Sequence, residues 1–274
     1  MSGLLEGKVA VVTGSGRGIG RATVELMAAH GARVVLADID AKPLEEAAEA
    51  VRAAGGEAIT LQGDATDPAF PGRLVEDTLG KFGTLDVIVN NAGYTWDGTI
   101  HKMSDAQWQA MLEIHLTVPF RLIRAASAYL RETAKKEAAE RGSAQARKIV
   151  NISSTSGTRG NAGQANYAAG KAGVVGLTKT LAREWGRFNI QVNAVAFGWI
   201  DTRLTRDKEE GVKIRRGEAE IALGVPAAQR EISRTLVPLG RPGTPQEAAG
   251  AVLFFASPLS DYISGQVLEV TGGL

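Results

Sequence analysis

The chain has 274 residues, 44% of them hydrophobic, and a formal net charge of +1, which indicates a large core and no strongly basic surface for nucleic acid. It contains no cysteine, which excludes disulfides, thiolate nucleophiles and cysteine-ligated metal. The N-terminus lacks a signal-peptide pattern and no apolar run is long enough to cross a bilayer, so we expect a cytoplasmic protein without membrane contact.

Seven apolar segments rich in β-branched residues alternate with longer segments of helical periodicity. The predicted strands are residues 8–13, 32–38, 58–64, 85–91, 148–153, 190–196 and 266–273. Strands that are apolar along their whole length and alternate with helices indicate a parallel sheet covered on both faces. We therefore predict an α/β fold over residues 1–274, a doubly wound single domain with a parallel seven-stranded sheet and helices on both faces.

Two charged segments interrupt this alternation. Residues 131–147 are rich in alanine and charge, and we interpret them as a helix end followed by an inserted, solvent-exposed loop. Residues 203–235 are charged, have weak periodicity and lie between two predicted strands without a strand of their own. A long segment without regular structure between two strands more often has a function than none, so we expect residues 203–235 to take part in the function.

The predicted strand 8–13 runs directly into a loop that contains Gly14, Gly18 and Gly20, and a helix follows at once. Glycines allow the backbone to approach a pyrophosphate, and the helix N-terminus offers free N–H groups and the positive end of the helix dipole. The spacing differs from the common G-x-G-x-x-G pattern, because Ile19 occupies the place of its last glycine. Alone, such a loop could be a tight turn without a ligand. Between a strand and a helix, it predicts a dinucleotide site.

The second predicted strand ends in Asp38, where a carboxylate can accept hydrogen bonds from both hydroxyls of an adenosine ribose. The same carboxylate would repel the 2′-phosphate of NADP. Arg17, in the glycine loop, could instead bind that phosphate. Because Asp38 would face the ribose directly, we expect NAD as the cofactor, with NADP as the less favoured alternative.

A helix that begins near Ala165 would place Tyr167 and Lys171 on one face, one turn apart. The lysine ammonium and an oxidised nicotinamide would favour the phenolate and lower the pKa of Tyr167 from its ordinary value near 10. Such a tyrosine can exchange a proton with an alcohol or a carbonyl while hydride moves to or from the nicotinamide. Ser154, at the end of a predicted strand, could hold the substrate oxygen. A tyrosine and a lysine at this spacing can also be a solvent-exposed pair, so the assignment depends on the neighbouring motifs.

These motifs together resemble those of the short-chain dehydrogenases/reductases, and the resemblance covers nearly the whole chain. It rests on Thr13-Gly14-x-x-x-Gly18-x-Gly20, on Asn90-Asn91-Ala92-Gly93, on Ser154 with Tyr167 and Lys171, and on residues 240–273. The resemblance implies a Rossmann fold with strand order 3-2-1-4-5-6-7 and a homotetramer. It also implies that residues 203–235 form a mobile lid over the substrate.

The resemblance also implies a role for individual residues. Tyr167 would be the catalytic acid/base, Ser154 would bind the substrate oxygen, and Lys171 would bind the nicotinamide ribose and lower the tyrosine pKa. Asp64 would contact the adenine amino group, Asn90 and Gly93 would line the adenosine side, and Ile200 and Thr202 would hold the carboxamide. The complete cofactor set expected is Gly14, Arg17, Gly18, Ile19, Gly20, Asp38, Asp64, Ala65, Asn90, Asn91, Ala92, Gly93, Tyr167, Lys171, Gly198, Ile200 and Thr202.

Two positions depart from the family pattern. His115 stands where the family usually has an asparagine that anchors a water in a proton relay to the lysine, so it is a candidate catalytic residue. It could equally be a packed helix histidine, and a histidine here is similar to the 3-hydroxyacyl-CoA dehydrogenase part of peroxisomal multifunctional enzymes. The usual Pro-Gly after the sixth strand is replaced by Phe197 and Gly198. His30 and His101 lie far from His115 in the sequence, so no metal site is predicted.

The expected reaction is the reversible, NAD-linked interconversion of a secondary alcohol and a ketone. Residues 157–173 are very similar to those of 3-oxoacyl-[acyl-carrier-protein] reductases, which makes a 3-oxoacyl thioester the first choice of substrate. Asp38 fits poorly with a biosynthetic reductase, which usually takes NADPH. The alternatives are a dehydrogenase of another secondary alcohol, such as a 3-hydroxyacyl thioester, polyol, sugar or steroid, and a dinucleotide-sensing protein without turnover.

Overall fold

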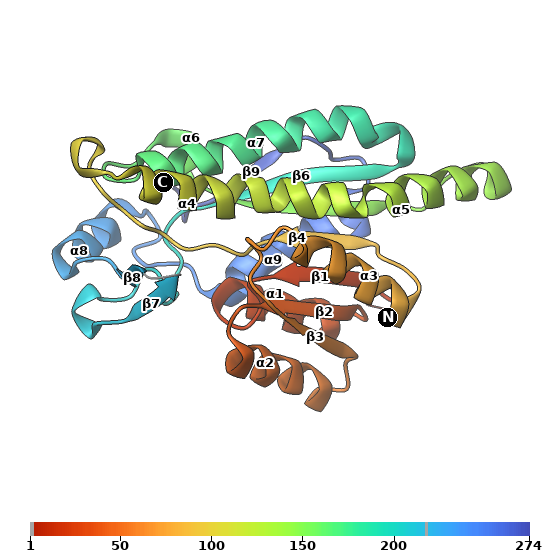
Figure 1. Ribbon diagram of the computed structural model, residues 1–274, viewed down its shortest axis with the longest axis horizontal. Coiled ribbons are helices and arrows are strands. Elements are labelled where there is room, and N and C mark those ends of the chain that lie inside the picture. Colours follow the sequence, from red (N-terminus) through yellow and green to blue (C-terminus); the bar gives the residue numbers. More distant parts are fainter. Residues whose placement is uncertain (1–2, 217–218) are drawn as a thin grey trace.

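A parallel sheet of seven strands forms the centre of the computed structural model, which describes residues 3–216 and 219–274 (Figure 1). The strands are β1 (Val9–Thr13), β2 (Arg33–Asp38), β3 (Ala58–Gln62), β4 (Val87–Asn90), β5 (Arg147–Ser154), β6 (Ile190–Phe197) and β9 (Val267–Val270). Their order in the sheet is β3-β2-β1-β4-β5-β6-β9, and every neighbouring pair is parallel. The sheet and its order confirm the predicted doubly wound Rossmann fold.

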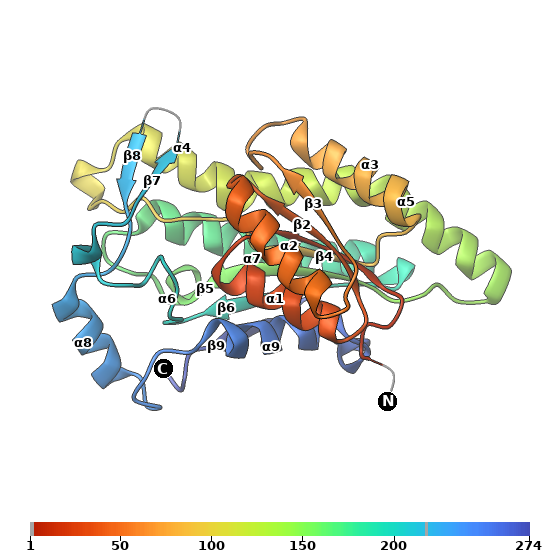
Figure 2. The same ribbon diagram turned by 90° about the horizontal axis from the view of Figure 1, so that it is seen from below.

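Helices cover both faces of this sheet, as Figure 2 shows. One face carries α1 (Gly18–Ala29), α2 (Ala41–Ala53) and α9 (Pro245–Ala256), and the other carries α3 (Phe70–Phe82), α5 (Val118–Arg141) and α7 (Ala165–Trp185). Alternate residues of each strand enter the two cores: Ala10 and Val12 pack towards α1, whereas Val9 and Val11 pack towards α3. Burial on both faces explains why the strands are apolar along their whole length. None of the described helices is long and apolar enough to span a membrane.

The segment between β6 and α9 differs from the expectation that it has no strand of its own. It contains the antiparallel hairpin of β7 (Lys213–Arg216) and β8 (Ala219–Ala222), followed by α8 (Ala227–Leu236). Ile214 and Ile221 are buried in a small apolar cluster with Tyr94 and Met111. Each strand is so short that it buries a single isoleucine, which is too little for a period-two pattern to be visible in the sequence.

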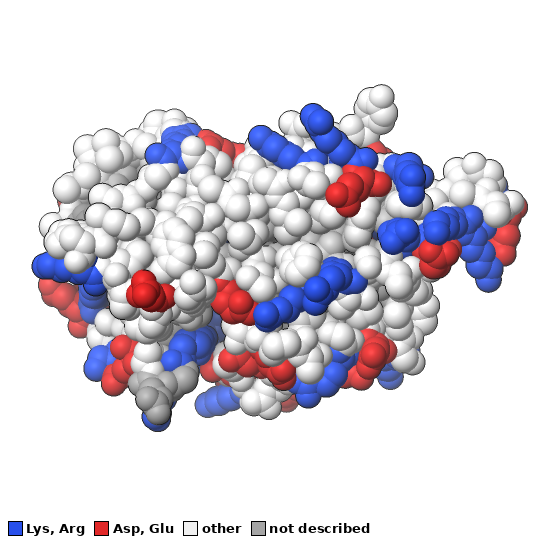
Figure 3. Space-filling model, turned by 45° about the horizontal axis from the view of Figure 1, so that its top comes forward, with Lys and Arg blue, Asp and Glu red and all other residues white. Residues whose placement is uncertain are grey.

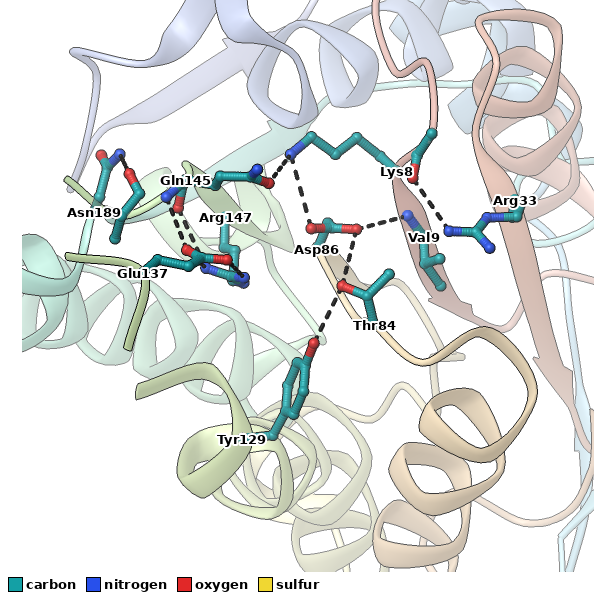
Figure 4. Close-up of polar contacts among 12 residues, drawn as sticks. Lys8, Val9, Arg33, Thr84, Asp86, Tyr129, Glu137, Gln145, Arg147 and Asn189 are labelled. Atoms are coloured by element: carbon teal, nitrogen blue, oxygen red, sulfur yellow. Dashed lines mark hydrogen bonds and ion pairs between the residues drawn. The ribbon is translucent and has the colours of Figure 1, made fainter. Parts of the chain in front are cut away.

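Residues 131–147 form the end of a helix followed by a short loop before β5. Helix α5 continues to Arg141 and ends at Gly142, which has a left-handed φ of 80°. The loop is therefore confined to residues 142–146, and Arg147 already belongs to β5. Its side chain is only 2% exposed, and its guanidinium donates to both carboxylate oxygens of Glu137 at 2.7 and 2.9 Å (Figure 4). These two charges thus pair within the protein, whereas other charged residues of the segment, such as Glu132, Lys136 and Glu140, are exposed.

A second polar group lies near this ion pair, at the amino ends of the strands. Asp86 is 5% exposed and accepts a hydrogen bond from the backbone N–H of Val9 at 3.0 Å. The Lys8 ammonium lies 3.8 Å from its other oxygen and also donates to Gln145 (Figure 4). Charged residues at this edge of the sheet therefore have structural partners.

Replacing Glu137 by alanine should lower the free energy of unfolding by about 3 kcal/mol, because it leaves the buried Arg147 guanidinium unpaired. Glu140→Ala is the matched control, since Glu140 is exposed on the same helix and faces Lys136 at 3.9 Å. It should change stability by less than about 0.5 kcal/mol. Urea denaturation of both variants measures the difference. Equal, small effects would mean that the Glu137–Arg147 pair does not stabilise the end of α5.

Candidate active site

A cavity of about 670 Å³ opens at the carboxyl ends of the strands. It lies between the loops that follow β1, β2, β4, β5 and β6, which is where open α/β sheets bind their ligands. Every predicted catalytic residue and every predicted cofactor residue except Asn90 lines it. The Asn90 side chain instead points into the sheet, where its amide donates to Asn151 Oδ1 at 2.8 Å. Asn90 ends a fully buried strand, so its side chain packs within the core instead of reaching the cavity.

The loop after β1 packs so closely that only glycine fits at two of its positions. Gly14 has a φ of 65°, and a Cβ there would lie 2.8 Å from the Cα of Ala92. A Cβ on Gly20 would lie 2.1 Å from the carbonyl oxygen of Gly14. The Asn91 amide donates to the carbonyls of Thr13 and Gly14 at 2.9 and 3.0 Å and so ties the loop to β4.

The start of α1 is open towards this cavity. Its N-cap residue, Arg17, forms no side-chain hydrogen bond to the first turn, so the free N–H groups remain available to a ligand. Gly18 and Gly20 in that turn also line the cavity and present no side chain that would fill it. The residues present therefore fit the phosphate groups of a dinucleotide.

The end of β2 supplies two carboxylates beside the glycine loop. Asp38 Oδ2 accepts a hydrogen bond from the N–H of Gly16 at 2.9 Å, and Oδ1 accepts one from the N–H of Asp40 at 3.1 Å. These bonds fix the Asp38 carboxylate at the cavity wall. Arg17, the alternative phosphate ligand, donates to Asp40 at 2.6 Å. Its guanidinium is thus already paired with a carboxylate.

Ser154, Tyr167 and Lys171 come together on the opposite side of the cavity. Helix α7 begins at Ala165, as predicted, and places Tyr167 and Lys171 one turn apart. The Lys171 Nζ lies 5.7 Å from the centre of the tyrosine ring and donates to the carbonyl of Ile152 at 2.6 Å. The Ser154 side chain, at the end of β5, is hydrogen-bonded to Tyr167. Two hydroxyl groups are therefore available to one substrate oxygen beside a buried amine.

Burial controls the protonation of this group. It raises the pKa of Tyr167 to about 12, although the hydrogen bond with Ser154 acts in the opposite direction. Burial also lowers the pKa of Lys171 from 10.5 to about 7. In the protein alone the net shift of the Tyr167 pKa is upward, because desolvation opposes the charged form of the buried phenol. At neutral pH the tyrosine is therefore protonated, and burial disfavours the charged form of the lysine.

His115 lies in a π-helical turn, Glu113–Thr117, that joins α4 (Asp105–Leu112) to α5. Its ring meets the ring of Tyr167 edge to face at a centroid distance of 4.8 Å. One ring nitrogen, Nε2, is 2.7 Å from the carbonyl of Tyr94, whereas Nδ1 is buried and has no hydrogen-bond partner in the described part of the chain. Burial and then the charge of Lys171 hold the His115 pKa well below its ordinary range. The imidazole is therefore neutral, donates through Nε2 and keeps Nδ1 as a free acceptor.

Comparisons with known proteins agree with this geometry. Residues 14–274 match the family model described as enoyl-(acyl carrier protein) reductase. The chain is 38% identical to the 3-oxoacyl-[acyl-carrier-protein] reductase of Thermotoga maritima and 40% identical to that of Escherichia coli, in each case over 98% of both chains. The chain belongs to the short-chain dehydrogenase/reductase family. A crystal structure from Burkholderia xenovorans, described as a member of this family, superposes with a TM-score of 0.83 at 32% identity and covers 98% of this chain and 97% of that one.

As a member of this family, the protein is an oxidoreductase that uses a nicotinamide dinucleotide. Its cavity contains functional candidates that the sequence did not indicate, among them Asp97, whose two carboxylate oxygens accept from Gln164 at 3.2 and 3.1 Å. Burial raises the pKa of Asp97, and its charge in turn opposes ionisation of Tyr167. Asp97 and Gln164 come from loops distant in sequence, so no local pattern could have paired them. Within the described ranges, no three His, Asp or Glu side chains are placed to hold a metal ion.

Two replacements of His115 should separate catalysis from packing. His115→Leu keeps the bulk but removes the free Nδ1 acceptor, so a relay role predicts lost turnover with little change in melting temperature. His115→Asn restores the residue usual in the family and should be nearly neutral for turnover. The measurements are kcat and the melting temperature of both variants. A leucine variant that melts earlier but retains full turnover would show that His115 only packs against Tyr167.

Proposed function

We propose that the protein interconverts a 3-oxoacyl thioester and the corresponding 3-hydroxyacyl thioester, with NAD(H) as its preferred cofactor. The observation that carries this proposal is the hydrogen-bonded pair of Ser154 and Tyr167 beside the buried amine of Lys171. The relatives named 3-oxoacyl-[acyl-carrier-protein] reductases support the thioester, since they are 38–40% identical over almost the whole chain. A dinucleotide-sensing role without turnover is less well supported, because all three side chains are in place.

The chain's own residues supply the proton chemistry of this reaction. A bound dinucleotide provides the hydride donor or acceptor, at C4 of its nicotinamide. In the direction of reduction, Tyr167 donates its proton to the substrate carbonyl oxygen, and the Ser154 hydroxyl donates a hydrogen bond to the same oxygen. A pKa of about 12 suits this direction, because the phenol is fully protonated at neutral pH. In oxidation, the ammonium form of Lys171 stabilises the phenolate that accepts the alcohol proton.

The choice of cofactor depends on Asp38. Its carboxylate is fixed by two backbone N–H groups at the end of β2, where the 2′-phosphate of NADP would meet a like charge. Asp38→Ala should therefore improve kcat/KM for NADPH relative to NADH by about tenfold or more. Steady-state kinetics with both cofactors measure the ratio.

Arg17 provides a further arm of this experiment. Because Arg17 is paired with Asp40, combining Asp38→Ala with Asp40→Ala should free the guanidinium and improve the use of NADPH further. Equal use of both cofactors by the unmodified protein would show that Asp38 is not at the ribose.

The substrate class is tested by a panel followed through the absorbance of NADH. 3-Oxoacyl thioesters of coenzyme A and of acyl carrier protein should be reduced faster than free ketones. The second candidate is oxidation of a polyol or another free secondary alcohol. It is favoured by Asp97 and Gln164, which place two polar side chains in the cavity near Tyr167. Faster oxidation of such an alcohol than of any 3-hydroxyacyl thioester would replace the thioester proposal with this one.

We also propose a cytoplasmic homotetramer with a single domain, in which residues 203–235 act as the lid. Large apolar side chains are exposed on the edge strand β9, with Leu268 at 38%, in the turn after α9, with Leu259 at 63%, and on α5, with Phe120 at 42%. Figure 3 shows a broad uncharged area over α7 and the first half of α5, whereas charged side chains gather towards the end of α5. These surfaces are suited to contacts between subunits. Light scattering measures the subunit number.

A further inference from the structure

Two arginines of the segment between β6 and α9 line the cavity without a salt bridge to any described carboxylate. Arg203 and Arg216 are both partly buried, and neither has a carboxylate partner within residues 3–216 and 219–274. Every other arginine that lines the cavity is paired with a carboxylate: Arg17 with Asp40, Arg159 with Glu269, and Arg230 with Asp207. Unpaired guanidinium groups in a half-buried site indicate that an anion completes it.

Arg203 lies above the glycine loop. The preceding residue, Thr202, brings its methyl group within 3.6 Å of the position of a Cβ on Gly18, in the first turn of α1. The Arg203 guanidinium itself lies within electrostatic range of Arg17 and Arg216, which disfavour its charge together with burial, and of Asp38 and Asp40. Arg203 therefore lies close to the first turn of α1 and to the end of β2.

Arg216 approaches the same region from another wall. It is the last residue of β7, and Ile214, two residues earlier on the same face of the strand, is buried against Tyr94. The Arg216 guanidinium lies 5.3 Å from the centre of the Tyr94 ring, and its Nη1 donates to the carbonyl of Arg215 at 2.8 Å. Tyr94 follows β4, so Arg216 is held between the end of that strand and Arg203.

We propose that Arg203 and Arg216 bind the pyrophosphate of the dinucleotide from the side opposite the N-terminus of α1, so that β7 closes over the cofactor. A pyrophosphate carries two negative charges, and guanidinium groups bind phosphate oxygens through pairs of parallel hydrogen bonds. The repulsion between the two arginines is then relieved only when the anion is present. The inference rests on the dinucleotide part of the proposed function and not on its substrate.

The surroundings favour the pyrophosphate over two other anions. A 2′-phosphate would lie at Asp38 and Asp40, where two carboxylates oppose it. An anionic group of the substrate near Ser154 and Tyr167 would meet the carboxylate of Asp97. Arg203, by contrast, follows Thr202, which lies beside Gly18 in the first turn of α1, where the free N–H groups attract the same anion.

The test is binding of NADH without any substrate, measured by calorimetry. Arg203→Gln and Arg216→Gln should each weaken binding by about tenfold or more, as expected for the loss of a charge-assisted hydrogen bond. Arg215→Gln is the matched control, because Arg215 carries the same charge on the same strand but is exposed and does not line the cavity. It should leave the affinity unchanged. Arg216→Lys should recover only part of the binding, because an ammonium lacks the planar fork.

Three ligands identify the group that is bound. ADP-ribose contains the pyrophosphate without the nicotinamide, and its affinity should fall by the same factor as that of NADH. AMP lacks the pyrophosphate, so the same substitutions should weaken its binding much less. A loss confined to NADPH would assign the arginines to the 2′-phosphate and overturn the proposal, as would unchanged NADH affinity with a raised substrate KM.

Hydrogen exchange of β7 gives a readout that is independent of affinity. ADP-ribose alone should protect the backbone amides of residues 213–216 in the unmodified protein. It should not protect them in the Arg203→Gln variant at a concentration that saturates it. Protection that appears only with substrate would overturn closure on the cofactor. Absence of turnover with every thioester would contradict the proposed substrate class but would not affect the interpretation of these binding measurements.

Discussion

Replacing Tyr167 by phenylalanine is expected to lower turnover by at least about a hundredfold while the affinity for NADH stays within about twofold. The ring and its edge-to-face contact with His115 remain, so packing changes little. What is lost is the only proton that this residue can transfer, together with the hydroxyl that is hydrogen-bonded to Ser154. Because burial raises the pKa of Tyr167 to about 12, the hydroxyl carries its proton throughout the neutral range.

Single-turnover kinetics and NADH fluorescence together measure this effect. Tyr262→Phe is the matched control, since the Tyr262 side chain is fully exposed and should be neutral in both measurements. Ser154→Ala should lower turnover as well, because the substrate oxygen then loses one of two donors. Near-normal turnover of the Tyr167 variant would remove the tyrosine from the proton-transfer step, whatever the cofactor affinity.

Replacing Lys171 by methionine should stabilise the protein at pH 6 and destabilise it at pH 10. Burial lowers the pKa of Lys171 from 10.5 to about 7, so between these values the unfolded chain holds a proton that the folded protein does not. The stability of the unmodified protein therefore rises with pH across this window and carries the full penalty below pH 7. Methionine has no titrating group, so its stability relative to the unmodified protein should fall by about 4 kcal/mol between pH 7 and pH 10.

A second effect makes the Lys171→Met variant less stable than the unmodified protein at pH 10. At pH 10 the neutral amine still donates to the carbonyl of Ile152 at 2.6 Å, a bond that methionine cannot replace. Denaturant unfolding at both pH values measures the difference between the two proteins. Lys179→Met, on the exposed side of the same helix, should change stability little at either pH. A pH-independent effect of Lys171→Met would mean that the amine is solvated in the folded protein.

The sheet could be predicted from the sequence because burial on both faces forces each strand to be apolar throughout. The helix that carries Tyr167 could also be predicted from the sequence, since its first residue, Ala165, follows a run of small and polar residues. The hairpin of β7 and β8 could not be predicted, because each strand buries one isoleucine. The pairing of Glu137 with Arg147 could not be predicted either, because the two residues lie on either side of a loop and the sequence does not show which charges are paired.

The candidate catalytic side chains could be located from motifs, but their protonation could not. Spacing places Tyr167 and Lys171 one turn apart, yet the sign of the tyrosine pKa shift depends on how deeply the ring is buried, which only the packed structure decides. Asp97, which opposes ionisation of that tyrosine, comes from another loop. Asn90 shows that a residue within a matching motif need not line the cavity, since its side chain points into the sheet.

The π-helical turn Glu113–Thr117 has a consequence for the spacing of residues along the helix. A π turn holds one residue more than an α-helical turn, and successive α-helical residues are rotated by about 100°. Because the wider turn absorbs this extra residue locally, deleting one residue within it would restore a regular helix with α4 and α5 still in phase and would shift only the side chains of the turn. If α5 kept Leu122 and Ala126 in the core, His115 would turn away from Tyr167. The contact between the rings of His115 and Tyr167 therefore depends on the number of residues in this turn as much as on their identity.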